Sequence, residues 1–312
     1  MILPLLAILL SVEPGPCRVT PLETVDRVDR DERPSGVPVL CYHHLSDRPR
    51  LFGISKWRLR SDLEELYRAG FYLVALDDLE NGLIQVPRGK RPLMLHFDDG
   101  WPEHLRFLET ADGGYALDPD CVLGLLESFC SEHPDFGRGA TFFVSWDKVP
   151  FGQSGMVEEK LNLLLDMGYE IGNHTYRHSS FAKLAPELWE DAISLALVRF
   201  HRNLGLRTCE VRTVAYPGGI LPRGTEAEAR LSGLSYGGRS SVELGFLVNG
   251  EVPSLDRLLG SRNACLRVGR IDMSRYTVGK LLSWNSLMAC GWGRSSLHDP
   301  LPYRATPLTG SR

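Results

Sequence analysis

From Val37 onward, short apolar runs alternate with segments in which apolar residues recur at helical spacing. The apolar runs predict strands at residues 37–42, 71–76, 92–97, 140–146, 169–172 and 211–219. The periodic segments predict helices at residues 56–70, 121–130, 157–168 and 186–205. Strands that alternate with helices of this length predict a parallel sheet or barrel. In such folds the chemistry lies at the C-terminal ends of the strands.

The two ends of the chain lack this pattern. Residues 1–12 are an apolar run as long as a signal-peptide core, but no Lys or Arg precedes it and no A-x-A-like site follows. It is too short to span a bilayer. Residues 13–36 combine prolines with mixed charge, as a linker does. We expect a folded domain at 37–285 and a poorly readable tail at 286–312. We interpret the apolar run as a weak export signal to the periplasm, the cell envelope or the medium. The alternative is that this N-terminus is buried or disordered.

The composition is that of an ordinary globular protein, with 43% hydrophobic and 24% charged residues. A net charge of -4 gives no basic footprint for nucleic acid. The seven cysteines are scattered without a C-x-x-C pair, which favours neither a disulfide framework nor a zinc ribbon. They are read most simply as small buried hydrophobes. Any metal site must therefore use His and carboxylate ligands.

Two short stretches contain candidate ligands. Asp98 and Asp99 end the strand at 92–97, where the simpler interpretation is a turn before Gly100. His174 and His178 are four residues apart, so both imidazoles can face one point, although two solvated histidines would show the same spacing. Together, two histidines and one carboxylate would leave metal positions open for water and substrate, as in a catalytic site. The second aspartate would then be free to act as a general base on that water.

These residues resemble the polysaccharide deacetylases with a NodB homology domain, carbohydrate esterase family 4. Their T-F-D-D-G motif is matched by HFDDG at 96–100, with His96 in place of threonine. Their H-[ST]-x-x-H motif is matched by HTYRH at 174–178, and ATFFV at 140–144 is also familiar. RTVAYPGG at 212–219 matches the third motif only in part. The resemblance covers about residues 37–272 and implies a distorted (β/α)7 barrel.

The resemblance also implies an activity and roles for individual residues. The activity is metal-dependent hydrolysis of acetyl groups from an N-acetylated sugar polymer. Asp98 would be the general base, and Asp99, His174 and His178 would bind a divalent ion, most simply zinc, with cobalt or nickel as alternatives. The backbone N–H of Gly218 would bind the oxyanion. The substrate partner would be an acetylated polysaccharide or glycan, while the polymer and the oligomeric state stay open.

The general acid is harder to assign than the other roles. SLHD at 296–299 resembles the late L-x-H-D motif of the family, but only thirteen residues follow it. VLCYHHLSD at 39–47 resembles the missing end moved to the front, a circular permutation of the branch that includes poly-N-acetylglucosamine deacetylases. We therefore prefer His43 over His298 as the acid, with His44 as its nearest competitor. Without the family, both early histidines would be read as an ordinary polar strand end.

Three other positions bear on this hypothesis. Ala215 stands where many members have an arginine that orients the base, so the tuning of Asp98 is an open question. His96 is expected to be a hydrogen-bonded core or rim residue near the site. Trp101 could stack on a sugar or simply pack. The rival functions are an O-acetyl esterase with the same residues and a carbohydrate-binding barrel whose catalytic site has decayed.

Overall fold

The computed structural model describes residues 36–76, 78, 86–87, 89–259 and 262–283. The segments expected as a signal-like run and a C-terminal tail therefore lie outside the described residues, as does nearly all of the linker. His298 lies outside them too. Within the described part, no helix has the length and apolar character needed to cross a membrane.

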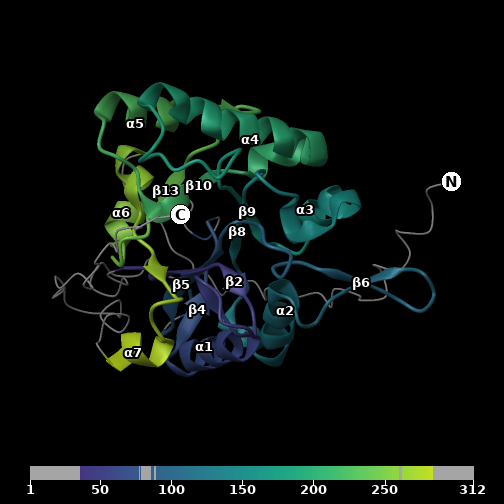
Figure 1. The fold of residues 1–312 in the computed structure, drawn as a ribbon. Helices are drawn as coiled ribbons and strands as arrows, with labels where there is room; N and C mark the ends of the chain where they lie inside the picture. Colours follow the sequence, from purple (N-terminus) through teal and green to yellow (C-terminus); the bar gives the residue numbers. More distant parts are fainter. Residues whose placement is uncertain (1–35, 77, 79–85, 88, 260–261, 284–312) are drawn as a thin grey trace.

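The centre of the molecule is a parallel sheet (Figure 1). Its strands follow the spatial order β13-β10-β9-β8-β5-β1-β14. Their bounds are β1 Val39–Tyr42, β5 Arg91–Phe97, β8 Thr141–Val144, β9 Glu170–Asn173, β10 Thr213–Ala215, β13 Leu244–Phe246 and β14 Ile271–Asp272. An additional strand, β4 (Phe71–Leu73), pairs with the first half of β5.

The segment that leads into β14 closes this sheet. Val268 forms a parallel bridge with Phe246 of β13, and the Leu247 N–H donates to the Val268 carbonyl at 2.8 Å. Three residues later, Ile271 pairs with Leu40 of β1. One stretch of chain thus contacts both ends of the sheet and closes a ring of seven strands among the described residues. The expected distorted (β/α)7 barrel is confirmed.

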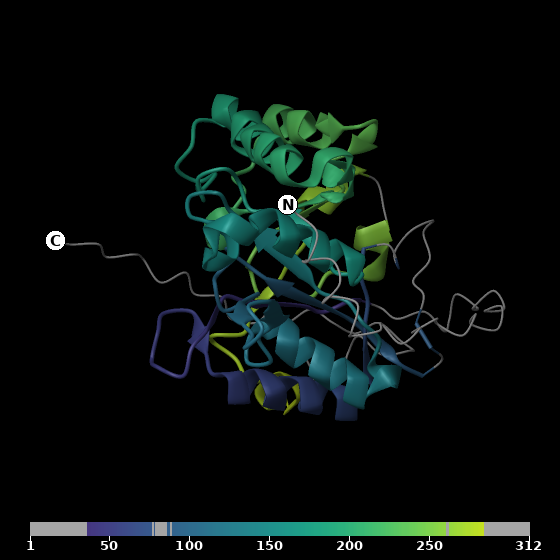
Figure 2. The ribbon, with the colours of Figure 1, turned by 90° about the vertical axis from the view of Figure 1, so that its right-hand side faces the viewer.

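Helices cover the outside of the barrel. Their bounds are α1 Lys56–Arg68, α2 Val122–Glu132, α3 Val157–Asp166, α4 Trp189–Leu204, α5 Thr225–Gly233, α6 Leu255–Leu259 and α7 Val278–Ser283. Helices α4 and α5 lie on one side of the sheet, and α1, α2 and α7 lie on the other (Figures 1 and 2). Short 3-10 turns join several elements: Pro134–Phe136, Pro150–Gly152, Ser154–Met156, Pro186–Leu188, Gly205–Glu210, Pro217–Gly219 and Arg262–Arg267.

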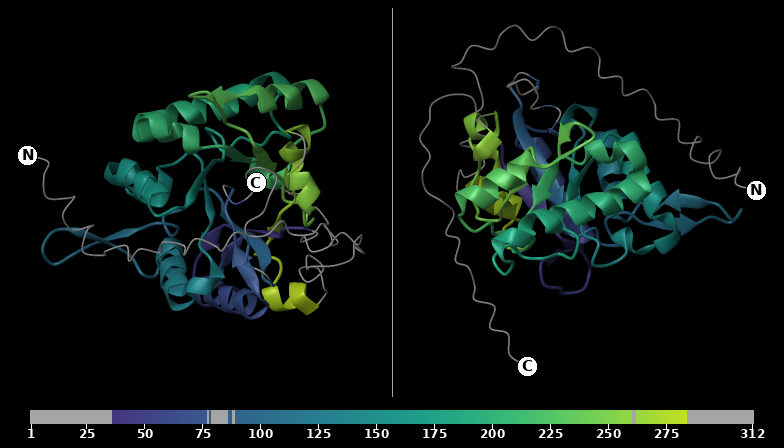
Figure 3. Two further views of the ribbon diagram at one scale, coloured as in Figure 1. Left: turned by 180° about the vertical axis from the view of Figure 1, so that it is seen from behind. Right: turned by 90° about the horizontal axis from the view of Figure 1, so that it is seen from above.

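Three two-stranded sheets lie outside the barrel. They pair β2 (His44–Leu45) with β3 (Gly53–Ile54), β6 (Phe107–Glu109) with β7 (Tyr115–Leu117), and β11 (Ser235–Tyr236) with β12 (Arg239–Ser240). The β6–β7 hairpin projects well beyond the body of the domain (Figure 3). The sequence patterns did not predict these elements.

Strand β5 shows how the fold positions polar side chains. Successive side chains of a strand point to opposite faces of the sheet. Leu93, Leu95 and Phe97 belong to the apolar cluster that includes the buried faces of the helices, whereas Met94 packs with Phe143 and Phe246 in a second cluster. That second cluster fills the inside of the barrel. A side chain two or four residues after Met94 therefore points inward, which places His96 and Asp98 in the barrel.

Candidate metal and catalytic site

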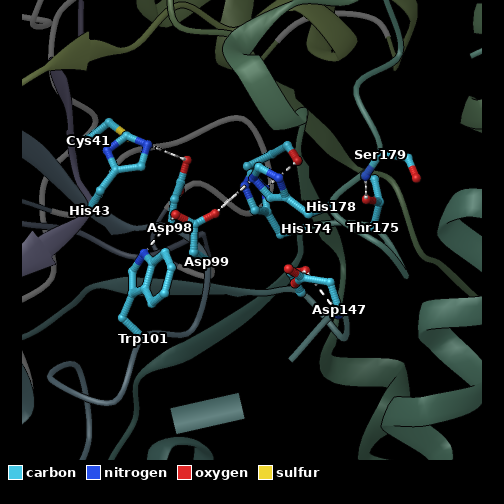
Figure 4. A network of polar contacts seen from close by, with 12 residues as sticks. Cys41, His43, Asp98, Asp99, Trp101, Asp147, His174, Thr175, His178 and Ser179 are labelled. Carbon is cyan, nitrogen blue, oxygen red and sulfur yellow. Dashed lines mark hydrogen bonds and ion pairs between the residues drawn. The ribbon is translucent and has the colours of Figure 1, made fainter. Parts of the chain in front are cut away.

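The structure brings Asp99, His174 and His178 together at the C-terminal ends of β5 and β9 (Figure 4). The Asp99 Oδ1 atom lies 3.2 Å from His174 Nε2 and 2.9 Å from His178 Nε2. Asp99 and His178 both have positive φ, at 80° and 51°. Non-glycine residues rarely adopt this conformation, and it is concentrated at functional sites.

The hydrogen bond of His174 makes this group a candidate cation site. Its Nδ1 lies 2.8 Å from the carbonyl oxygen of Ala215, which can only accept a hydrogen bond, so Nδ1 bears the proton. In the neutral imidazole, Nε2 then presents a lone pair toward Asp99. The Asp99 Oδ1 atom is buried and has no well-aligned donor among the described groups. Lone pairs that face a carboxylate repel it unless a cation lies between them, so this set fits a divalent ion.

The local electrostatics keep Asp99 ionised. Burial favours the neutral form of Asp99, but the neighbouring imidazoles of His174 and His178 outweigh it. Burial also favours the neutral form of His178, but the attraction of Asp99 outweighs it. The pKa of Asp99 therefore lies far below its ordinary value, and the pKa of His178 lies above its ordinary value. The carboxylate is ionised at neutral pH, as a metal ligand must be.

Asp98 points into the barrel and meets a buried arginine. Arg270 Nη1 and Nη2 donate to Asp98 Oδ1 and Oδ2, each at 2.7 Å, and the two residues are 0% and 1% exposed. Burial raises the pKa of Asp98, but Arg270, His174 and His43 outweigh it, so the pKa of this carboxyl lies well below its ordinary value. The bidentate pair holds Asp98 ionised and fixed in orientation.

Arg270 answers the question that Ala215 raised. It lies just before β14, in the closing segment of the barrel, and its side chain packs against Phe143 and Phe246. A guanidinium thus faces Asp98 although Ala215 lacks one. The sequence analysis missed this residue because residues 232–312 show little periodicity, and no local pattern distinguishes this arginine from the others.

The structure separates the two early histidines. His43 Nε2 lies 3.9 Å from Asp98 Oδ2, and its side chain remains 18% exposed. His44 instead donates its Nδ1–H to Glu103 Oε1 at 2.8 Å, and its ring packs on Trp101. Of these two histidines, only His43 faces Asp98. His104, to which the sequence analysis assigned nothing, holds the His43 backbone, because its Nε2 contacts the His43 carbonyl.

Two further positions complete the description of the site. Gly218 adopts a φ of 78° in the turn after β10, and a side chain there would lie 3.5 Å from the Ser180 hydroxyl, close in sequence to His178. The turn that contains Gly218 therefore lies beside the segment that follows His178. His96 is fully buried against Phe143 and Phe246, and neither ring nitrogen has a hydrogen-bond partner among the described protein groups. It is a core residue without the expected hydrogen bond.

Trp101 contacts the site through its indole N–H. Its Nε1–H donates to Asp99 Oδ2 at 2.8 Å, which leaves Oδ1 directed at the two histidines (Figure 4). We expect Trp101→Phe to weaken zinc binding by about 10- to 100-fold, the usual effect of removing a hydrogen bond to a ligand. Competition with a chromophoric chelator measures this. Wild-type zinc affinity in the variant would show that Trp101 does not support Asp99. The matched control is Trp57→Phe, at an exposed tryptophan on α1.

The comparisons with known proteins concern the family and the fold. Residues 135–237 match the family model described as Polysaccharide deacetylase. This segment contains His174, His178 and the turn with Gly218, and the match confirms the resemblance to that family. No curated protein matches the sequence.

Solved structures share the fold. The deacetylase PplD of Streptococcus pyogenes, in complex with acetate, has a TM-score of 0.57 at 17% identity, over 81% of this chain and 99% of that one. IcaB from Ammonifex degensii has a TM-score of 0.56 at 20% identity, over 81% and 98%. A polysaccharide deacetylase from Bacillus cereus has a TM-score of 0.57 at 15% identity, over 80% and 69%.

Proposed function

We propose that this protein is a metal-dependent polysaccharide deacetylase that removes N-acetyl groups from a hexosamine polymer. The proposal rests on one observation. Asp99 lies together with His174 and His178, and its neighbour in sequence, Asp98, is held by Arg270. The family match of residues 135–237 supports the same reaction class. Acetate is the product such a reaction would release, and it is the ligand in the PplD structure.

In the proposed reaction, Asp99, His174 and His178 hold a divalent ion, with zinc as the first choice because imidazole and carboxylate suit it and leave positions open. Such an ion would polarise the acetyl carbonyl and the attacking water. Asp98 accepts the proton of that water, and Arg270 keeps Asp98 ionised for this task. The Gly218 N–H hydrogen-bonds to the oxygen on which negative charge develops.

His43 is the proposed general acid. Its imidazole lies on the opposite side of Asp98 from the two histidine ligands (Figure 4). Protonation of the departing nitrogen matters for an amide, because an unprotonated amine anion is a very poor leaving group. Because the His43 imidazole is partly exposed, the solvent can reprotonate it after each turnover. This role favours N-deacetylation over O-deacetylation.

The proposal also concerns location. The apolar run at residues 1–12 supports export to the periplasm, the cell envelope or the medium, where a polymeric glycan would be the substrate.

Acetate release from a panel of glycans tests the proposed function. We expect release from N-acetylglucosamine oligomers, its loss on treatment with a chelator, and its recovery on addition of zinc, cobalt or nickel. Release that survives chelation would contradict the metal dependence. Release only from O-acetylated xylan would identify an O-acetyl esterase. Glycan binding without acetate release, even in added zinc or cobalt, would indicate a carbohydrate-binding barrel.

A further inference from the structure

A second group of potential metal ligands lies beside the first. Cys41 Sγ is 3.4 Å from Asp98 Oδ2, and His43 Nε2 is 3.9 Å from the same oxygen. All three ligand atoms lie within 4.8 Å of one another. Cys41 is the inward-facing residue of β1 next to the strand end, and it pairs across the ladder with His96 of β5. The group thus comes from two neighbouring strands of the barrel.

The distances match those of a tetrahedral ion. With zinc–sulfur bonds of about 2.3 Å and zinc–oxygen or zinc–nitrogen bonds of about 2.0–2.1 Å, sulfur and oxygen ligands lie about 3.6 Å apart, and nitrogen and oxygen about 3.3 Å apart. The observed sulfur–oxygen distance of 3.4 Å is about 0.2 Å shorter than this value, and the observed nitrogen–oxygen distance of 3.9 Å is about 0.6 Å longer. A rotation of the His43 side chain, which is partly exposed, can supply this adjustment.

From this geometry we propose that Cys41, His43 and Asp98 form a second, inhibitory site for zinc and similar thiophilic divalent ions. Thiolate, imidazole and carboxylate are together a ligand set that zinc prefers. On binding, the thiol gives up its proton to the solvent, because the thiolate is the ligand. Asp98 keeps its contact with Arg270, since each carboxylate oxygen has two lone pairs.

The consequence for turnover rests on the proposed function. An ion at this site would occupy the lone pairs of the proposed base and of the proposed acid simultaneously. Neither group could then exchange a proton with the substrate. Arg270 places a positive charge against Asp98, which weakens the attraction for a second cation. We therefore expect this site to fill only when metal exceeds one equivalent, so that excess zinc lowers the rate of acetate release.

Cobalt titration of the metal-free protein tests the site independently of activity. The Asp-His-His set contains no sulfur, so a sulfur-to-cobalt charge-transfer band reports a cysteine ligand. We expect two bound equivalents and one such band in the native protein. In Cys41→Ser we expect the band to disappear and one equivalent to remain. Cys209→Ser, at another free cysteine, should keep both equivalents and the band.

Several results would overturn the proposal: a single equivalent in the native protein, a second equivalent without the band, or a band that survives in Cys41→Ser. If Cys41→Ser fails to fold, His43→Ala provides the same test, because it should lose the second equivalent and keep the first. The rate of acetate release with excess zinc, divided by the rate with one equivalent, should be well below one in the native protein and near one in Cys41→Ser. Absence of acetate release in every sample would refute the proposed function and leave the cobalt result to decide the site.

Discussion

Asp98→Asn is expected to lower the turnover number for acetate release by about 10²- to 10⁴-fold, the usual contribution of a general base. The amide is nearly the same size as the carboxylate but cannot accept the proton of the attacking water. Asp99, His174 and His178 are unchanged, so one equivalent of metal should remain bound. Acetate release per mole of bound zinc, measured on samples checked for folding, gives the comparison. Turnover close to that of the wild type would remove Asp98 as the base.

The control for this variant must separate lost chemistry from a lost buried ion pair. Asp98→Asn also leaves Arg270 without its carboxylate, which destabilises the fold. Asp118 is another buried aspartate that pairs with an arginine, Arg106, but it lies between β7 and α2 rather than after β5. Asp118→Asn should lower the stability and retain turnover. A comparable loss of turnover in both variants would indicate a general effect of weakened folding.

The periodic part of the sequence predicted most of the barrel. Helix α1 is an example: Leu59, Leu63 and Leu66 are fully buried on one face, and the Ser55 hydroxyl accepts from the Arg58 N–H at its start. Gly70 follows it with a φ of 79°. In such segments, local propensity and burial act in the same direction, so the pattern identifies the element. The strands that lead into Asp98 and His174, and the strand that contains Ala215, were predicted for the same reason.

The closing segment of the barrel could not be predicted in this way. Strands β13 and β14 have three and two residues, too few to show a period. Their pairing depends on contacts such as Val268 with Phe246, which join parts of the chain through tertiary structure. The pairing of β1 with β14, which the suggested circular permutation requires, is likewise a tertiary feature.

The candidate site also contains residues that the sequence patterns predict and residues that they do not. The proposed ligands and the proposed base come from contiguous motifs, and the structure brings them together. Arg270 and His104 act on Asp98 and His43 across large separations in sequence, so no motif contains them. Cys41 illustrates a different difficulty: it was read as a buried hydrophobe, and it is indeed buried, but its thiol donates to Asp98. Burial alone did not reveal what the sulfur faces.

Arg270→Gln is expected to lower the free energy of unfolding by about 3–5 kcal/mol at pH 7, because it leaves Asp98 as a buried carboxylate without its countercharge. In the native protein, the lowered pKa of Asp98 adds stability that is present above the unfolded value of about 3.9 and is lost as the pH falls through the folded value. In the variant, burial is no longer opposed by the guanidinium, so the pKa of Asp98 rises above about 3.9. The variant then takes up a proton on folding and gains stability as the pH falls.

Both effects have the same sign, so the difference in stability between native protein and variant should shrink from pH 7 toward pH 4.5. Urea unfolding at the two pH values measures it. The raised pKa of Asp98 should also move the acidic limb of kcat/KM to higher pH. Arg270→Lys should restore part of both properties, whereas Arg267→Gln, which removes a partly exposed arginine paired with Glu228, should show neither pH effect. A stability difference that does not change with pH would mean that Arg270 stabilises the barrel through packing and its bond to the Leu247 carbonyl rather than through the charge of Asp98.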